Sequence, residues 1–100
     1  MASRNYADVE TALRARMDIL RARYHVKRIG VFGSFARGSQ TAKSDIDILV
    51  SFSVPVGLFH FARTNSYIKS VLKRRVDLST SAALKPAARR SVLGEVRYIA

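Results

Sequence analysis

Two aspartates separated by one apolar residue, Asp45 and Asp47, are the residues of this sequence best placed to do chemistry. They open the segment DIDILVSF, in which every second residue is apolar, as is typical of a β-strand. Because side chains on a strand repeat every second residue, both carboxylates point to the same side. Two like charges so placed repel each other, and burial would raise the pKa of at least one of them, unless a cation lies between them. A hard divalent ion bound through oxygen, typically Mg²⁺, resolves that conflict.

A third acid, Asp77, lies in the segment RVDLST between Val76 and Leu78, and we expect it on the same sheet face as the pair. The sequence holds only seven acids, and three of them occupy apolar strand contexts. Charged side chains are rare in such contexts unless they are paired or bind a metal. Three carboxylates around two metal ions can activate an attacking hydroxyl and stabilise a leaving phosphate. An alternative stays open, in which Asp77 is a strand-end carboxylate paired with Arg75 or another neighbour.

The glycine-bearing turn GSFARG, from Gly33 to Gly38, could supply a phosphate site. Gly33 ends a predicted strand and Ser34 opens a helical turn, so free backbone N–H groups and the serine hydroxyl can meet a phosphate. Arg37, one turn later, could either contact the anion or brace the loop. The two glycines have the spacing of a P-loop, but Ser39-Gln40 stands where Lys-Ser/Thr is required, which excludes a Walker A site.

The elements that must position these residues follow from the spacing of apolar side chains. Steps of three or four residues predict amphipathic helices on both sides of the aspartate-bearing segments. These helices are expected from Asn5, as N-cap, to about Arg23, from Leu58 to the basic cluster at 73–75, and from Pro86 onward with Ala88, Val92 and Val96 facing inward.

Three short strands are expected between these helices, in KRIGVFG (27–33), DIDILVSF (45–52) and RVDLST (75–80). Helices alternating with short strands predict an α/β (α+β) fold, in which a small three-stranded mixed sheet is packed with helices. No linker, repeat or low-complexity tract interrupts the pattern, so residues 1–100 are expected to form a single domain.

The overall charge is strongly basic, with 18 Lys+Arg against 7 Asp+Glu and a formal net charge of +11. This balance fits either a solvated basic surface or a polyanionic partner, and charge alone does not choose between them. The absence of cysteine excludes disulfides and thiolate metal sites and fits a reducing compartment. No apolar run approaches the roughly 18 residues of a membrane span, and the first residues lack the apolar core of a signal peptide. We therefore expect a cytoplasmic protein without a membrane partner.

Taken together, the motifs resemble the nucleotidyltransferase superfamily that includes DNA polymerase β: a Gly-Ser turn, a loop, Asp-x-Asp on the next strand and a lone Asp on a third. More closely, the segments VFGSFARGSQTAKSDIDILVSF, PVGLFHFARTNSYIKSVLKRRVDLST and ALKPAARRSVLGEVRYI are similar to those of the minimal nucleotidyltransferases. The resemblance covers about Lys27 to Ile99 and implies the nucleotidyltransferase fold for the single domain.

The resemblance also implies a role for each matching position. The Gly-Ser turn would hold the nucleoside triphosphate, the Asp-x-Asp pair would bind metal, and the third carboxylate would join the metal site and deprotonate or orient an acceptor hydroxyl. The matching residues are Gly33 and Ser34 in the turn, Arg37 at a basic position after it, Asp45 and Asp47 in the pair, and Asp77 as the third carboxylate.

The activity that the resemblance implies is Mg²⁺-dependent transfer of AMP from ATP to a hydroxyl, with two metal ions and departure of pyrophosphate. Proteins of this family are usually encoded beside a HEPN-domain toxin, and they act as its antitoxin by adenylylating a tyrosine. A hetero-oligomer with a HEPN partner is thus expected, and nucleic acid is not expected as a direct substrate.

Two other functions are weighed beside this one. A non-catalytic antitoxin would neutralise its partner by direct contact alone. A basic nucleic-acid-binding protein would use the net charge of +11, but it would leave the three aspartates unexplained. His25 and His60 have no ligand partner at metal spacing and are not expected to be catalytic, whereas Phe35 could belong to the core or stack on a base.

Overall fold

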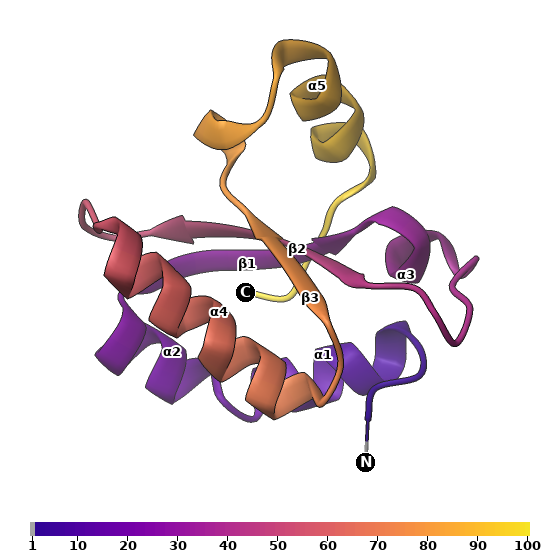
Figure 1. Cartoon of the computed structure of the whole chain (residues 1–100), viewed down its shortest axis with the longest axis horizontal. Coiled ribbons are helices and arrows are strands. Elements are labelled where there is room, and N and C mark those ends of the chain that lie inside the picture. Colours follow the sequence, from indigo (N-terminus) through magenta and orange to yellow (C-terminus); the bar gives the residue numbers. More distant parts are fainter. Residues whose placement is uncertain (1) are drawn as a thin grey trace.

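A four-stranded mixed sheet in the order β3-β2-β1-β4 organises the computed structural model, which describes residues 2–100 (Figure 1). The central strand β1 (Val26–Phe32) is antiparallel to β2 (Ile46–Phe52) and to β4 (Arg97–Tyr98). Strand β3 (Val76–Ser79) runs parallel to β2 at one edge. The predicted α/β class and the mixed character of the sheet are confirmed.

The fourth strand was not predicted, so the expected count of three strands is wrong. Strand β4 is only two residues long, and both of its side chains are exposed, which leaves no alternation of apolar residues to detect. It pairs with Gly30 and Val31 of β1. A Cβ on Gly30 would collide with the Val96 side chain, so glycine at this position lets the last segment approach the sheet.

Helices cover the sheet unequally (Figure 1). Three of them lie together on one face, a short helix follows β1, and a 3-10 turn and one further helix stand on the other side. Their bounds are α1 (Tyr6–Arg14), α2 (Met17–Tyr24) and α4 (Leu58–Leu72) on the first face, then α3 (Gly33–Arg37), and finally η1 (Ser81–Ala83) and α5 (Pro86–Glu95). Within residues 2–100, none of the helices combines the length and the apolar character needed to cross a membrane.

The first predicted helix is two helices, because the chain turns at Ala15 and Arg16. No glycine or proline marks this break. The turn lets α1 pack against α4 while α2 packs against both β1 and α4, and the apolar stripe stays buried on both sides of it, at Val9, Leu13, Met17 and Leu20. Asn5 caps α1 as predicted, since its side chain accepts a hydrogen bond from the Asp8 N–H at 2.9 Å.

The last helix, α5, is only partly inward-facing. Val92 is buried, but Ala88 is exposed, so the prediction that Ala88 faces the core is wrong. The first half of α5 is held instead by Arg89, which donates hydrogen bonds to the carbonyl oxygens of Ser81 and Leu84. A polar anchor therefore replaces apolar packing at this end of the helix.

Phe35 of α3 is fully buried, which assigns it to the hydrophobic core and not to a base-stacking surface. It packs in one cluster with residues of the sheet and of the first helical face, including Ile48 and Leu72. The guanidinium of Arg74 lies 4.8 Å from the centroid of its ring. The short helix that carries the Gly-Ser turn is thus anchored by one large apolar side chain.

Replacing Phe35 by alanine should therefore destabilise the fold strongly. We expect Phe35→Ala to lower the free energy of unfolding by about 3–5 kcal/mol, because it leaves a large cavity in the core. Phe59→Ala is the matched control, since Phe59 is 80% exposed and surface substitutions usually change stability by about 0.5 kcal/mol or less. Urea denaturation followed by circular dichroism measures both, and equal effects would contradict the assignment of Phe35 to the core.

Candidate active site

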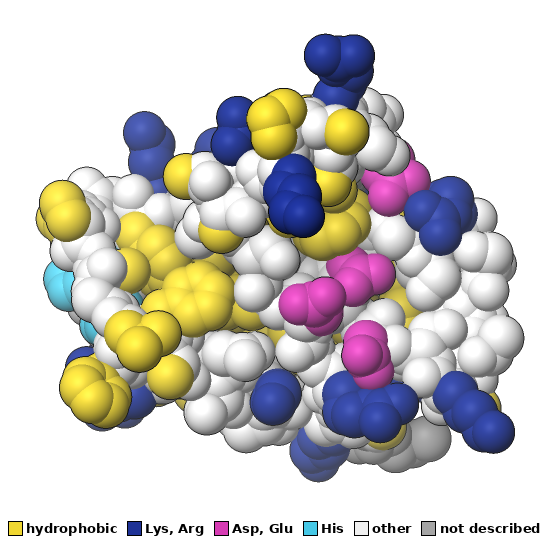
Figure 2. Space-filling model, turned by 45° about the horizontal axis from the view of Figure 1, so that its top comes forward, with side chains coloured by type: hydrophobic (Ala, Val, Ile, Leu, Met, Phe, Trp, Pro, Cys, Tyr) yellow, Lys and Arg dark blue, Asp and Glu magenta, His cyan; other side chains and the backbone are white. Residues whose placement is uncertain are grey.

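The candidate site is built on the pairing of β2 with β3. In this parallel pair Asp47 lies directly opposite Asp77, so the two side chains share one face of the sheet. Asp45 stands two residues before Asp47, immediately ahead of β2. The three aspartates singled out in the sequence are thus brought to one end of the sheet, and acidic side chains gather near the middle of the face in Figure 2.

The three aspartates differ in exposure. Asp47 is half-buried, whereas Asp45 and Asp77 are exposed, so the apolar neighbours of these two along the chain do not bury them. The physical reason is their place in the sheet. Asp77 is on the edge strand β3, and Asp45 precedes β2, so neighbouring backbone covers them on fewer sides. Burial therefore acts mainly on the carboxyl group of Asp47, whose pKa it raises.

The carboxyl group of Asp47 is the strongly perturbed acid of this site. Burial raises its pKa to about 6, and the nearby charges of Asp77 and Asp45 act in the same direction. The guanidinium of Arg37 lowers the pKa in part. The repulsion between paired carboxylates that the sequence predicts is therefore present, and a bound cation would relieve it.

Asp45 has a partner of its own. Its Oδ1 atom lies 3.0 Å from Nε of Arg75 in an ion pair that is largely open to solvent. Arg75 therefore pairs with Asp45 and not with Asp77, which was the alternative reading of Asp77. An exposed pair of this kind contributes little to stability and exchanges readily.

The glycine turn lies directly beside Asp47. Gly33 has a φ of +71°, in the left-handed region that favours glycine, and it begins α3 as β1 ends. A Cβ at this position would collide with Oδ2 of Asp47, so only glycine lets the turn and the carboxylate approach so closely. Gly38, with a φ of +75°, ends the short helix as predicted.

Glu95, at the end of α5, is a residue of this site that sequence reasoning missed. The Gly33 N–H donates to its Oε1 atom at 3.0 Å, across 62 residues of sequence. Nη1 of Arg37 donates to both of its carboxylate oxygens, at 3.2 and 3.0 Å. The hydrogen bond from Gly33 and the charge and hydrogen bond of Arg37 hold the pKa of Glu95 below its usual range. No local sequence pattern predicts this contact, because it forms only when α5 packs near the Gly33 turn in the folded chain.

Of the two roles left open for Arg37, these contacts fit the brace, because its side chain binds Glu95, which also accepts the Gly33 N–H. A contact of Arg37 with an anion stays a prediction. The turn is consequently fixed by a carboxylate on one side and by Asp47 on the other, with Ser34 half-buried behind it. Gly33 thus lies against the Asp47 carboxylate, and the charges of Arg37, Asp45 and Asp77 act on it.

The histidines lie away from this point. His60 on α4 hydrogen-bonds through Nε2 with the carbonyl oxygen of Tyr24, at 2.7 Å, and its ring lies 5.6 Å from that of His25. Both belong to the contact between α2, β1 and α4 on the opposite side of the sheet from α5 (Figure 1).

The carboxylates of Asp45, Asp47 and Asp77 are the oxygen ligands available for the Mg²⁺ that the family resemblance implies. Among residues 2–100, no three His, Asp or Glu side chains are gathered closely enough to enclose an ion. The ligand chemistry nevertheless fits a hard cation: Asp47 and Asp77 face each other in register, burial and the neighbouring carboxylates raise the pKa of Asp47, and Asp45 is held only by an exposed ion pair.

Comparison with known proteins now identifies the family. A family model described as a nucleotidyltransferase domain matches residues 13–99. A protein adenylyltransferase, MntA of Thermococcus cleftensis, is 39% identical over 99 residues, which cover 99% of this chain and 100% of the relative. The chain belongs to the minimal nucleotidyltransferases. This minimal nucleotidyltransferase has its Gly-Ser turn and all three aspartates inside the matched region.

Solved structures agree with this assignment. The minimal nucleotidyltransferase superposes with a TM-score of 0.81 and 31% identity on a chain named "Structure of putative minimal nucleotidyltransferase", over 97% of this chain and 98% of that one. A chain from the complex of a tri-AMPylated Shewanella oneidensis HEPN toxin with an MNT antitoxin superposes with a TM-score of 0.66, over 92% of this chain and 71% of that one. At 18% identity, the second likeness shows the fold alone.

The raised pKa of Asp47 makes a prediction for the metal-free protein. Between the ordinary value of 3.8 and about 6 the folded state binds more protons at Asp47 than the unfolded state does, so this residue reduces stability increasingly as the pH rises through that window. Asp47→Asn removes the titration. We expect the free energy of unfolding of Asp47→Asn, relative to wild type, to increase from about pH 4 to about pH 6 and then to level off.

Urea denaturation in EDTA, repeated across this pH range, measures the difference. Asp18→Asn is the matched control, because Asp18 is an exposed acid on the first turn of α2. It should show no such increase. A difference for Asp47→Asn that stays flat, or that falls as the pH rises, would contradict the buried and repelled state of this carboxylate.

Proposed function

We propose that this minimal nucleotidyltransferase transfers AMP from ATP to a tyrosine hydroxyl of a HEPN-family protein and thereby neutralises it as an antitoxin. The observation that carries the proposal is the in-register pair Asp47 and Asp77, with the Gly33 turn packed against Asp47. The relative of 39% identity is named a protein adenylyltransferase, which supports a protein acceptor and an adenylyl group. The cytoplasm, where ATP is abundant, is the compartment expected for this reaction.

The proposed reaction is a single displacement at phosphorus. The acceptor oxygen forms a bond to the α-phosphorus of ATP, the bond from that phosphorus to the bridging oxygen of the β-phosphate breaks, and pyrophosphate leaves. Asp77 orients the acceptor hydroxyl and takes its proton. Because Asp77 is exposed on an edge strand, a large protein acceptor can approach it from solvent. The protein contributes mainly positioning and charge.

We assign Mg²⁺ to Asp45, Asp47 and Asp77. When bound, the ions neutralise the phosphate charge and lower the pKa of the attacking hydroxyl. Asp47, whose pKa is raised in the absence of a cation, would be kept ionised there, so it would be available as an oxygen ligand at neutral pH. The turn that begins at Gly33 is the proposed support of the triphosphate, through the Ser34 hydroxyl and N–H groups other than that of Gly33, which donates to Glu95.

A HEPN protein is the proposed acceptor and partner. The structural neighbour from Shewanella oneidensis is described as a tri-AMPylated HEPN toxin in complex with an MNT antitoxin, which supports both a hetero-oligomer and repeated adenylyl transfer. Nucleic acid is not proposed as a substrate, since three exposed or half-buried aspartates would repel its phosphates in the absence of metal.

Asparagine substitutions at the carboxylates test this function. With purified protein, ATP, Mg²⁺ and a HEPN-family protein from the same genome, mass spectrometry should detect one or more adenylyl groups on a HEPN tyrosine. Asp47→Asn and Asp77→Asn should each lower the transfer rate by about 100-fold or more, because they remove a metal ligand or the proton acceptor. Asp18→Asn, a remote acid on α2, should keep the wild-type rate.

The same variants separate catalysis from mere binding. If Asp47→Asn loses transfer but still neutralises the HEPN toxin in cells, neutralisation works by direct contact and the antitoxin part of the proposal is wrong. If wild type with Mg²⁺ binds the HEPN protein but adds no adenylyl group to it, the proposed acceptor is wrong.

A further inference from the structure

An apolar groove lies between the first turn of α4 and the end of β3. Its volume is about 420 Å³. The residues that line it include Phe52, Leu58, Phe61, Leu78 and Thr80. Among its described lining residues none is charged, although charged residues make up 25% of the chain. The groove therefore offers a large apolar surface, with polar contacts limited to backbone and hydroxyl groups.

The groove lies close to the candidate active site along β3, although none of the three aspartates lines it. Ser79, which lines the groove, is two residues after Asp77 on the same face of the strand, whereas Leu78 points into the core from the other face. Figure 2 shows apolar side chains in a hollow immediately beside the gathered acids. Strand β3 is an edge strand, so a polypeptide that brings a hydroxyl to Asp77 can continue along the groove without crossing the sheet. The groove is thus placed where residues next to an acceptor hydroxyl would lie.

An unpartnered apolar side chain stands at the rim of the groove. Leu58, which lines the groove, is 79% exposed on the first turn of α4. A large exposed apolar side chain at the edge of an apolar hollow is typical of a protein-binding surface. Burial of Leu58 against a partner would contribute to binding without any cost to the fold of the free protein.

The absence of charge among the described lining residues indicates what kind of molecule fits the groove. The triphosphate of a nucleotide or the backbone of a nucleic acid needs cationic or N–H donors, and the described lining supplies no charged group. An apolar, uncharged segment of protein fits such a lining, with hydroxyls at Ser79 and Thr80 available to its backbone.

We propose that this groove docks an apolar segment of the acceptor protein, next to the hydroxyl that receives the adenylyl group. The inference rests on the proposed function, because it assigns to the acceptor a surface beside Asp77. It makes Leu58 a determinant of which protein is modified, separate from the carboxylates that carry the chemistry.

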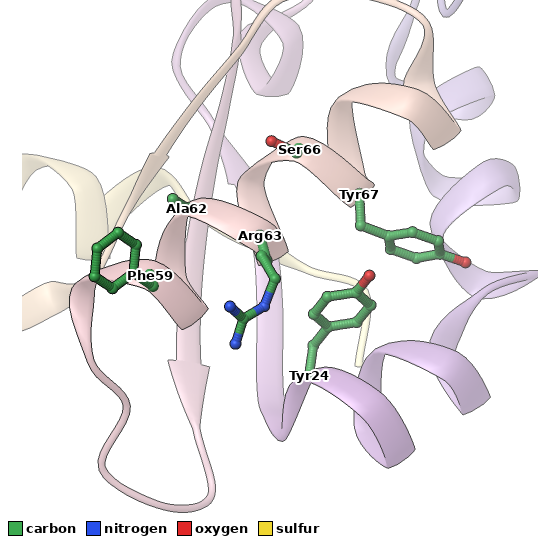
Figure 3. Close-up of a pocket in the computed structure, with 6 residues that line it drawn as sticks. All are labelled: Tyr24, Phe59, Ala62, Arg63, Ser66 and Tyr67. Atoms are coloured by element: carbon green, nitrogen blue, oxygen red, sulfur yellow. The ribbon is translucent and has the colours of Figure 1, made fainter.

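A second hollow on the opposite side of α4 provides the comparison. Its volume is about 500 Å³, and Figure 3 shows Tyr24 and Tyr67 side by side at it, with Arg63 nearby; the two tyrosine rings are stacked with their centroids 4.9 Å apart. Phe59, the neighbour of Leu58, lines this hollow and is 80% exposed. Leu58 and Phe59 are therefore adjacent, equally exposed and apolar, but they line different hollows.

This pair of residues gives a matched test. Leu58→Glu and Phe59→Glu add the same charge to the same exposed helical turn, and both variants should fold like wild type. Calorimetric titration with the HEPN protein, without nucleotide, should show that Leu58→Glu weakens binding by on the order of ten-fold or more. Phe59→Glu should bind as wild type does. In the transfer assay, Leu58→Glu should raise the KM for the HEPN protein and leave the KM for ATP unchanged.

Other outcomes would assign the groove to another occupant or to none. A raised KM for ATP in Leu58→Glu would place the adenine base there and overturn the proposal. If the wild type is a dimer in size-exclusion chromatography and Leu58→Glu is a monomer, a second copy of this chain occupies the groove. That result would also overturn the proposal. Equal weakening by both variants would also overturn it. If wild type binds the HEPN protein and only Leu58→Glu weakens that binding, docking stands even where no adenylyl transfer is detected.

Discussion

The parallel pairing of β2 with β3 is the constraint on which the candidate site depends. It sets Asp47 opposite Asp77 on one face while Ile46, Ile48, Val76 and Leu78 point into the core from the other. A slip of one residue would turn Asp77 toward the core and Leu78 toward solvent, so the hydrophobic effect that fixes the register also fixes the carboxylates. Chemistry and packing are thus determined by the same backbone hydrogen bonds.

The position of the glycine turn also depends on strand pairing, here between β1 and β2. Phe32 pairs with Asp47 across β1 and β2, so the residue that follows Phe32 must lie next to that carboxylate. Glycine is required because any Cβ at Gly33 would meet the Asp47 side chain. The buried ring of Phe35 then holds the short helix down on the core. Three consecutive elements, β1, α3 and β2, therefore form a rigid unit around one acid, while the third carboxylate comes from the edge.

Much of this arrangement could be predicted from local patterns. The two-residue period of DIDILVSF placed Asp45 and Asp47 on one side, and Gly33 and Gly38 bounded the short helix as expected. What could not be predicted depends on contacts across the fold. The break at Ala15 has no sequence signal because it follows the shape of the core, and the exposure of Asp77 depends on β3 being an edge strand. Glu95 reaches Gly33 only through the path of α5.

The contact between Glu95 and Gly33 also has a consequence for the timing of activity during synthesis. Strands β1 to β3, the aspartates and the glycine turn all come earlier in the chain than the carboxylate that braces the turn and than strand β4. Because chains emerge from the ribosome from the N-terminus onward, the turn lacks its brace until residues 95–98 are free to fold. A growing chain would thus carry its three aspartates before the turn beside them is braced.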